Sequence, residues 1–235
     1  MTKDKSHSWT PEDWRKLWDQ NAERTDDLGA TGRGGMSVIG FLHTVASAAS
    51  TLQLTSEDHL LDIGCGTGLF ALSFSPFVKT IHGVDISKKM IDRAQQNCSE
   101  LTNVSFSVGS LNNPGITPKY TNKVLLFSVL QYLSNINEAF QVLDTISNIL
   151  PQGGKGLLAS NPNPECADIF WEKTLEGRDK ETQSRITEQK NQTLWADPKE
   201  LISYAKMLGL SAYAQPVTKR IWQSCYMFDL ILDKS

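Results

Sequence analysis

At residues 60–70 the chain reads Leu60-Leu61-Asp62-Ile63-Gly64-Cys65-Gly66-Thr67-Gly68-Leu69-Phe70, and this stretch decides its fold. It opens as an apolar run, which is typical of a strand buried on both faces, and a helical pattern resumes at Leu69. The glycines between them predict a turn, because glycine adopts backbone angles that a β-carbon forbids and lets a ligand touch the main chain. A strand, a glycine turn and a helix in this order favour a nucleotide-binding βα unit, whose ligand lies at the carboxyl end of a parallel sheet.

A second strand-like run, Thr80-Ile81-His82-Gly83-Val84-Asp85, ends in an acid. A carboxylate at the tip of the second strand is placed to accept hydrogen bonds from both hydroxyls of a ribose, so we expect a ligand that contains a nucleoside. A dinucleotide fingerprint would need its third glycine where Leu69 stands, and a P-loop would need Gly-Lys-Ser or Gly-Lys-Thr after the glycines. Neither pattern is met, which disfavours a nicotinamide dinucleotide and a nucleoside triphosphate.

The two segments Leu61–Gly68 and Gly83–Ser87 resemble the corresponding motifs of the class I, Rossmann-like S-adenosylmethionine-dependent methyltransferases. The resemblance covers roughly residues 55 to 235. It implies a single Rossmann-like α/β domain with a seven-stranded, mostly parallel sheet, an antiparallel last strand and helices on both faces. It also implies S-adenosyl-L-methionine as the cofactor and methyl transfer to an oxygen or nitrogen of a small-molecule acceptor, such as a metabolite or a sugar-like biosynthetic intermediate.

The same resemblance assigns cofactor-binding roles to residues around the strand tips. Ile86 and Met90 would flank the adenine, and Ser110 stands where many members of the family carry an acid. Arg33 lies in a glycine-rich loop, where its guanidinium suits the carboxylate of a methionyl group, although an exposed loop arginine is an equal alternative. The cofactor-binding residues expected in this way are Arg33, Asp62, Gly64, Cys65, Gly66, Gly68, Asp85, Ile86, Met90, Ser110, Leu111 and Ser128.

The chain divides into an N-terminal helical cap at residues 1–54 and the methyltransferase-like domain at residues 55–235, with an insertion at residues 161–196. In the cap, Thr10-Pro11-Glu12-Asp13 predicts a helix start. The following face with Trp14, Leu17 and Trp18 either packs on the main domain or forms a lid over the ligand, and the resemblance favours a mixture of the two. Later strands are expected at residues 104–108, 124–130, 156–160, 210–217 and 221–232. A helix is expected at residues 36–54, with Val38, Phe41, Leu42, Val45 and Leu52 inside. Residues 161–164 are expected to form a turn.

Catalytic candidates follow the fourth strand, whose tip faces the methyl group in this family. Gln131 and Tyr132 are placed there to orient an acceptor, and His43 is a third candidate because its helix precedes the first strand. A plain packing role for Tyr132 is an equal alternative. Other candidates for a base are His7, Glu165 and Asp168. In the insertion, Asp168, Trp171 and Trp195 are candidates for the pocket wall.

The composition of the chain limits the classes of molecule that it is expected to bind. The formal net charge of −3 shows no excess of basic residues for nucleic acid. The four cysteines are far apart, which indicates reduced thiols, and no metal site is expected. No apolar run reaches membrane-spanning length and no signal peptide is seen, so a cytoplasmic monomer or homodimer is expected. Alternative functions are a protein or nucleic-acid methyltransferase, a NAD-dependent dehydrogenase, and a non-catalytic S-adenosylmethionine-binding protein of the same fold.

Overall fold

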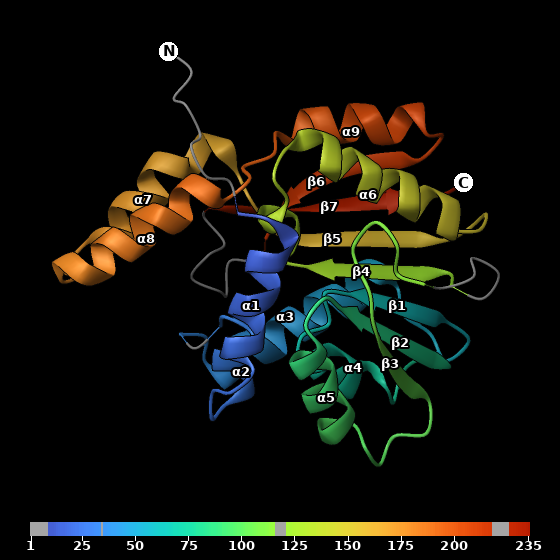
Figure 1. Cartoon of the computed structure of the whole chain (residues 1–235). Coiled ribbons are helices and arrows are strands. Elements are labelled where there is room, and N and C mark those ends of the chain that lie inside the picture. The colour runs from blue at the N-terminus through green and yellow to red at the C-terminus, as the bar shows by residue number, and fades with distance from the viewer. Residues whose placement is uncertain (1–8, 34, 116–120, 218–225) are drawn as a thin grey trace.

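The computed structural model describes residues 9–33, 35–115, 121–217 and 226–235, and a seven-stranded sheet runs through them (Figure 1). The strands lie in the order β3-β2-β1-β4-β5-β7-β6. Their bounds are β1 His59–Ile63, β2 Thr80–Asp85, β3 Val104–Val108, β4 Lys123–Phe127, β5 Lys155–Pro162, β6 Ser211–Pro216 and β7 Met227–Asp233. The pairs among β1 to β5 are parallel, and β7 pairs antiparallel with both β5 and β6. The predicted α/β fold with an antiparallel last strand is therefore confirmed.

Helices cover both faces of the sheet. Helices α6 (Ile136–Ile149) and α9 (Pro198–Met207) lie together on one face, and α4 (Leu69–Phe74) and α5 (Lys88–Asn97) lie on the other (Figure 1). Helix α3 (Val38–Leu52) shares a second apolar core with α4 and the sheet. Strand order reverses between β2-β1 and β4, and this is the point at which ligands bind in open α/β sheets.

The buried face of α3 differs from the predicted one. Gly40, Thr44, Ala48 and Leu52 are buried, whereas Val38 and Leu42 are 69% and 59% exposed. Small side chains at a spacing of four residues bring this face of the helix against β5. The prediction is confirmed for Leu52, and Val45 packs against the same core, but it is wrong for Val38 and Leu42. The prediction for the helix itself is right to within two residues at each end.

Two strand ends also differ from the sequence prediction. Strand β4 ends at Phe127 rather than at Leu130, because Ser128 adopts a left-handed φ of 60° and a 3-10 helix, η1, covers Leu130–Tyr132. Strand β5 continues through the expected turn to Pro162, with a bulge after Leu158. A proline is tolerated there because it stands at the end of the strand. The first part of the strand predicted at residues 221–232 lies outside the described residues.

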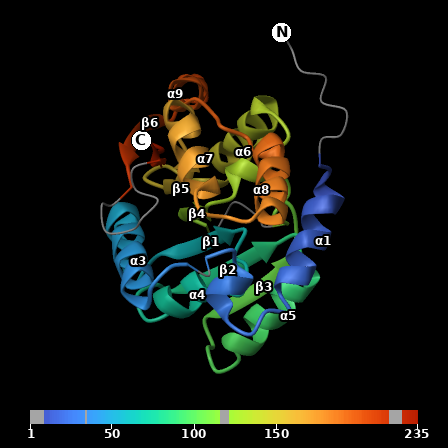
Figure 2. The ribbon, with the colours of Figure 1, turned by 90° about the vertical axis from the view of Figure 1, so that its left-hand side faces the viewer.

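The N-terminal cap and the insertion lie at the same end of the sheet. Helix α1 (Pro11–Asn21) begins with a capping box between Thr10 and Asp13 and is followed by the short α2 (Asp27–Ala30). The insertion forms η2 (Pro164–Cys166), α7 (Ala167–Leu175) and α8 (Lys180–Gln192). Figure 2 shows α8 beside α1, and the main-chain N–H of Trp9 donates to Gln192 Oε1 at 2.9 Å. None of the helices in the described ranges is long and apolar enough to cross a membrane.

Candidate active site

The glycine turn after β1 has left-handed backbone angles at each glycine. The φ values are 77° at Gly64, 53° at Gly66 and 79° at Gly68. A β-carbon on Gly64 would lie 2.5 Å from Val129 Cγ2, and one on Gly66 would lie 2.8 Å from Thr31 Cγ2. The turn is held to the next strand because the N–H groups of Gly64 and Cys65 donate to the Val84 carbonyl at 2.7 and 3.1 Å. Conformation and space thus both require glycine at the first two positions.

Asp85 at the tip of β2 faces this turn. Its Oδ2 accepts from the Gly66 N–H at 2.9 Å, and its Oδ1 accepts from the Ser87 N–H at 2.9 Å. Burial raises the pKa of the Asp85 carboxyl, and the two N–H donors act in the opposite direction. Each carboxylate oxygen accepts more than one hydrogen bond, so Asp85 fixes the turn and still has capacity to bind a ligand.

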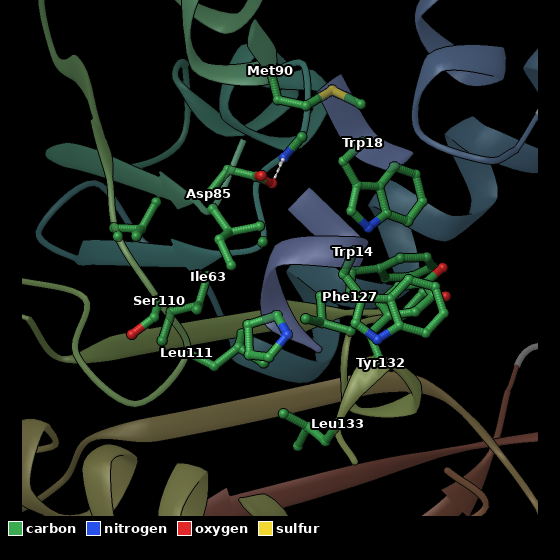
Figure 3. Close-up of a pocket in the computed structure, with 18 of the residues that line it drawn as sticks. Trp14, Trp18, Ile63, Asp85, Met90, Ser110, Leu111, Phe127, Tyr132 and Leu133 are labelled. Carbon is green, nitrogen blue, oxygen red and sulfur yellow. Dashed lines mark hydrogen bonds between the residues drawn. The ribbon is translucent and has the colours of Figure 1, made fainter. Parts of the chain in front are cut away.

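A cavity of about 260 Å³ opens over the turn and Asp85 (Figure 3). Figure 3 shows Asp85 and Met90 at one side of it, Ser110 and Leu111 at another, and Trp14, Trp18 and Tyr132 together across from them. Ten of the predicted site residues line this cavity, namely Arg33, Gly64, Gly66, Asp85, Ile86, Met90, Ser110, Leu111, Ser128 and Tyr132. The structure thus brings together residues that are up to about 100 positions apart in the chain.

A second cavity, of about 430 Å³, adjoins the first. The two cavities share a wall that consists of Trp14, Trp18, Thr31, Arg33, Phe127, Ser128 and Tyr132. Beyond this wall, the second cavity is lined by α1, by Gln131 on η1 and by the insertion, including Trp171 and Trp195. One cavity therefore lies over the glycine turn and the other lies under the lid and the insertion.

A family model described as a methyltransferase domain matches residues 60–154, the segment that contains the glycine turn and Asp85. This match supports, for residues 60–154, the resemblance to the class I S-adenosylmethionine-dependent methyltransferases. The chain is 29% identical over 117 residues to the uncharacterized methyltransferase YcgJ of Bacillus subtilis, an alignment that covers 49% of this chain and 45% of the relative. It is 39% identical over 72 residues to the 23S rRNA (uracil(1939)-C(5))-methyltransferase RlmD of Aliivibrio salmonicida, over 30% of this chain and 16% of the relative.

Among solved structures, the chain is similar to the N-methyltransferase NodS of Bradyrhizobium japonicum, determined in complex with S-adenosyl-L-homocysteine. The TM-score is 0.66 at 15% identity, and the match covers 93% of this chain and 95% of NodS. At this identity the likeness shows the fold alone. The alignments span less than half the length of the first curated relatives, so the sequence comparisons concern chiefly the cofactor half of the fold.

Three of the predicted cofactor residues lie behind the wall of the first cavity. Asp62, Cys65 and Gly68 do not line the first cavity, although they belong to the strand and turn that form it. Asp62 is 1% exposed, and its Oδ2 has no hydrogen-bond partner among the described residues. Burial raises the pKa of this carboxyl to about 7, and the Arg33 guanidinium acts in the opposite direction.

The buried Asp62 predicts a pH-dependent stability. In the unfolded chain this carboxyl ionises near its ordinary pKa of about 3.9, whereas in the folded protein it stays neutral up to about pH 7. Wild-type stability should therefore fall as pH rises from about 4 to about 7, by up to roughly 4 kcal/mol. Asp62→Asn lacks this loss, so its Tm should exceed that of the wild type by a margin that grows between pH 5 and pH 8. The exposed Asp92→Asn is the control, and a margin for Asp62→Asn that is the same at every pH would contradict the assignment.

Arg33 lies between the two cavities, not in an exposed loop. Its Nη2 donates to the Phe127 carbonyl at 3.3 Å, and its guanidinium lies 4.6 Å from the centroid of the Phe127 ring. Burial lowers the pKa of Arg33. No carboxylate within the described ranges forms an ion pair with it, so the guanidinium has donors available to a ligand.

Tyr132 joins the lid to the strand tips. Its ring centroid lies 4.7 Å from that of Trp14 and 5.3 Å from that of Trp18, both on α1. Burial raises the pKa of the Tyr132 phenol, so this side chain is protonated near neutral pH.

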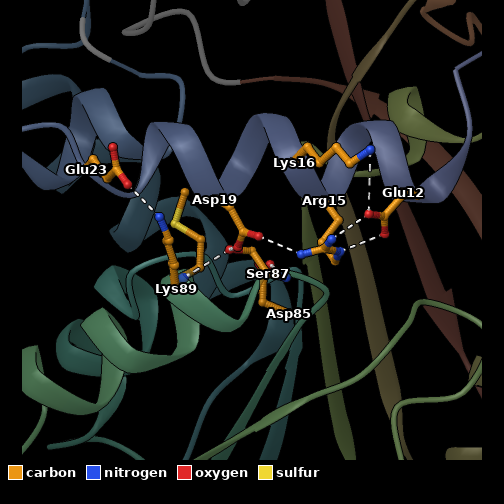
Figure 4. Close-up of polar contacts among 9 residues, drawn as sticks. Glu12, Arg15, Lys16, Asp19, Glu23, Asp85, Ser87 and Lys89 are labelled. Atoms are coloured by element: carbon orange, nitrogen blue, oxygen red, sulfur yellow. Dashed lines mark hydrogen bonds and ion pairs between the residues drawn. The ribbon is translucent and has the colours of Figure 1, made fainter.

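Polar contacts hold α1 and the residues after it against α5 (Figure 4). Ser87 Oγ donates to Asp19 Oδ1 at 2.6 Å, and Lys89 forms an ion pair with Glu23.

The packing of Tyr132 supports a second prediction. Tyr132→Ala removes the ring on which both tryptophans rest, so we expect about 2–4 kcal/mol of lost stability and faster hydrogen exchange of the α1 amides. Tyr132→Phe keeps the ring and should change stability by less than about 1 kcal/mol. Denaturant unfolding and hydrogen exchange measured by mass spectrometry test both variants. Exchange in α1 that is equal for Tyr132→Ala and wild type would show that the lid does not depend on this ring.

The remaining candidates are divided between the cavities and other places. Gln131 lines the second cavity, where its Oε1 has no hydrogen-bond partner within the described part of the chain. His43 lines neither cavity, and its helix α3 packs against β5 and α4. Glu165 and Asp168 also line neither, and His7 lies outside the described residues. No cluster of His, Cys, Asp and Glu that would hold a metal ion occurs in the described ranges.

Sequence reasoning missed several residues that line the first cavity. Thr31, Val129, Glu138 and Gln141 are among them. They come from a turn, a strand tip and a helix face that carry no recognisable motif, so their position depends on tertiary packing. The position of Val129 in the sequence was a signal, because β1 and β4 are neighbouring parallel strands and the residues that follow them lie at the same edge of the sheet.

Proposed function

We propose that the chain transfers the methyl group of S-adenosylmethionine to an oxygen or nitrogen of a small-molecule acceptor. The observation that carries this proposal is the pair of cavities that meet at Ser128 and Tyr132, one over the glycine turn with Asp85 and one under the lid and the insertion. The first would hold the cofactor and the second the acceptor. Two partly open cavities that share one wall suit the transfer of a group between two bound molecules.

The residues of the first cavity fit this cofactor. Asp85 has acceptor capacity for two ribose hydroxyls, and the unpaired Arg33 guanidinium suits the methionyl carboxylate. Ile86, Met90 and Leu111 offer apolar surface to an adenine, and the missing β-carbon of Gly66 leaves the main chain open to the ligand. When bound, S-adenosylmethionine supplies a methyl group on a positively charged sulfur. This sulfur is a good leaving group because it becomes a neutral thioether when the methyl group is transferred.

The chain would act mainly by positioning and by excluding water. Tyr132 and Ser128 form the wall between the cavities, and α1 with its tryptophans covers both. Positioning of two reactants is worth roughly 7–11 kcal/mol of barrier. Among the described residues that line the second cavity there is no His, Asp, Glu, Lys or Cys, and the Tyr132 phenol holds its proton. The acceptor should therefore arrive as a neutral amine or as an already ionised oxygen, which needs no base.

The relatives that act on ribosomal RNA do not favour RNA as the acceptor here. The RlmD proteins match 28% to 46% of this chain and 16% to 24% of their own length. The chain also has a net charge of −3, and nucleic-acid binding requires clustered positive charge. The N-methyltransferase NodS and the geranyl diphosphate C-methyltransferase of Streptomyces coelicolor match more than nine-tenths of this chain in structure. A small-molecule acceptor agrees better with these findings than a nucleic acid or a protein.

A thermal-shift experiment with S-adenosylmethionine, S-adenosylhomocysteine and NAD tests the proposal. A ligand that binds only the folded state raises Tm, by about 2.7 kcal/mol of stability at a concentration 100 times its Kd. We expect a rise with the first two ligands and none with NAD. A rise with NAD alone would point to a dehydrogenase, and no rise with any of the three would point to a protein that keeps the fold without the cofactor.

A further inference from the structure

The charged side chains that line the second cavity, within the described part of the chain, are all positive. Arg24, which follows α1, and Arg33 are the charged residues that line it, and no carboxylate lines it within the described part of the chain. Neither guanidinium is paired with an acid among the described residues. Arg24 lies at an exposed position and Arg33 is half-buried, so positive charge is present both at the mouth and at the inner wall. This distribution attracts an anion and disfavours a cation.

The remaining wall is largely aromatic. Trp14 and Trp18 come from α1, and Phe170, Trp171 and Trp195 come from the insertion. The insertion rings pack edge to face, with centroids 5.6 Å apart for Phe170 and Trp195 and 5.9 Å apart for Trp171 and Trp195. Aromatic walls contributed by two separate segments suit a flat, unsaturated ligand, which contacts ring faces and edges over its whole area.

Two buried polar atoms in this cavity have no partner among the described residues. They are the indole Nε1 of Trp195, a donor, and Oε1 of Gln131, an acceptor. The main-chain N–H of Leu194 donates to the Gln131 carbonyl at 2.9 Å, which holds the Trp195 segment against η1. Buried polar atoms are nearly always satisfied in folded proteins, so the bound ligand should supply an oxygen to Trp195 and an N–H or O–H to Gln131.

We propose that the acceptor is a planar aromatic oxyanion, of the class of arenecarboxylates that carry a neutral amino group. This inference rests on the proposed function and names the class of acceptor for the same site. The anionic oxygens are bound by Arg24 and by the Trp195 N–H, while Arg33 holds the methionyl carboxylate of the cofactor. The ring lies between the aromatic walls, and the amino group donates to Gln131 and releases its proton to water after it has been methylated. Gln131 is then a positioning residue, because an amide oxygen orients the group without taking its proton.

Aromatic walls also bind organic cations, and this alternative is disfavoured by the charges. The face of Phe127 is already covered by the Arg33 guanidinium at 4.6 Å. The methionyl carboxylate of a bound cofactor would offset Arg33, but a cationic ligand would still face Arg24 with no carboxylate in the described lining of the second cavity. A planar aromatic anion contacts the same rings and is not repelled by the arginine side chains.

Isothermal titration of the full chain, saturated with S-adenosylhomocysteine, tests the acceptor class. Three probes share a naphthalene ring and differ in charge, namely naphthalene-2-carboxylate, naphthalene-2-carboxamide and 2-naphthylmethylammonium. A fourth probe, decanoate, keeps the carboxylate but has no planar ring. We expect the carboxylate to bind about tenfold more tightly than the carboxamide, and the ammonium to bind more weakly than both. Equal affinity for the three naphthalene probes, or tighter binding of the ammonium, would overturn the anion assignment. Decanoate that binds as tightly as the naphthalene carboxylate would overturn the planar ring.

Two variants locate the binding in this cavity. Arg24→Gln should weaken the carboxylate about fivefold and leave the carboxamide unchanged, since only the charge differs. Arg178→Gln, an exposed arginine outside both cavities, is the matched control and should change neither probe. Trp195→Phe keeps an aromatic ring but removes the N–H, so it should weaken the carboxylate and the carboxamide together. An unchanged carboxylate affinity in both Arg24→Gln and Trp195→Phe would place the binding elsewhere.

The outcome for the acceptor class is separable from that for the proposed function. Titration of S-adenosylhomocysteine into wild type comes first, and its failure would overturn the proposed function together with this inference. If S-adenosylhomocysteine binds but the probes are not discriminated by charge, the proposed function stands and the inference is wrong.

Discussion

Asp85→Ala should lose most of the affinity for S-adenosylhomocysteine, with a Kd raised at least about 100-fold. Hydrogen bonds to a charged group are worth about 1.5–3 kcal/mol each, and two ribose hydroxyls would lose their acceptor. Because each 1.4 kcal/mol is a factor of ten in Kd, two such bonds account for the expected loss. Isothermal titration at neutral pH measures it directly.

The same substitution has a structural effect that must be measured alongside. The Gly66 N–H now donates to Asp85 Oδ2 at 2.9 Å, and Asp85→Ala leaves this donor unpaired in the turn. Asp85→Asn keeps the size of the side chain and one acceptor, so its affinity should lie between those of wild type and Asp85→Ala. Asp92→Ala is the control, since this exposed carboxylate of α5 pairs with Lys88 far from the turn. A folded Asp85→Ala protein with wild-type affinity would refute the ribose assignment.

Gly64→Ala should destabilise the protein by about 2–5 kcal/mol and abolish binding of S-adenosylhomocysteine at micromolar concentrations. Two costs add here. The residue has a φ of 77°, which an alanine adopts only at a cost of about 1–2 kcal/mol. Its β-carbon would also lie 2.5 Å from Val129 Cγ2, which forces the turn and the β4 tip apart. Chemical denaturation and titration of the ligand check the two effects.

A second substitution separates the two costs. Val129→Ala removes the methyl group that Gly64→Ala would meet, but it leaves the backbone angle unchanged. The double variant should therefore be more stable than the sum of the single effects predicts, by about 1–3 kcal/mol. Additive effects would mean that the clash contributes nothing and that the backbone angle alone sets the cost. Gly153→Ala is a useful comparison, because it has a φ of 78° but nothing within 4 Å of the added carbon.

The sequence predicted the parts of the site that are encoded locally. The turn from Gly64 to Gly68 and the acid at Asp85 are a short motif whose backbone geometry is a property of its own residues, so the structure places both at the first cavity. The antiparallel end of the sheet was implied by the resemblance to the methyltransferase family, and the structure confirms it. The positions of Asp62 and Cys65 behind the wall were not, because burial depends on which face of β1 the neighbouring strands and helices cover.

The second cavity shows why the rest was out of reach. Its walls come from α1, from η1 and from an insertion that begins about 150 residues after α1, and no sequence pattern links them. The orientation of α3 is a similar case. Val38 and Leu42 are more hydrophobic than Gly40 and Thr44, but the smaller residues face the sheet because they allow the helix to approach it. His43 was consequently predicted at a site that its helix does not reach.

The division of the chain between its two cavities has an evolutionary consequence. The family model covers residues 60–154, which include the glycine turn and Asp85, whereas most of the second cavity is built from segments before and after this range. Residues 60–154 can therefore stay similar among homologues that share a cofactor, while the segments before and after them diverge. Exchange of α1 and of residues 161–196 between homologues offers a direct route to chimeras with new acceptor preferences, without redesign of the central strands.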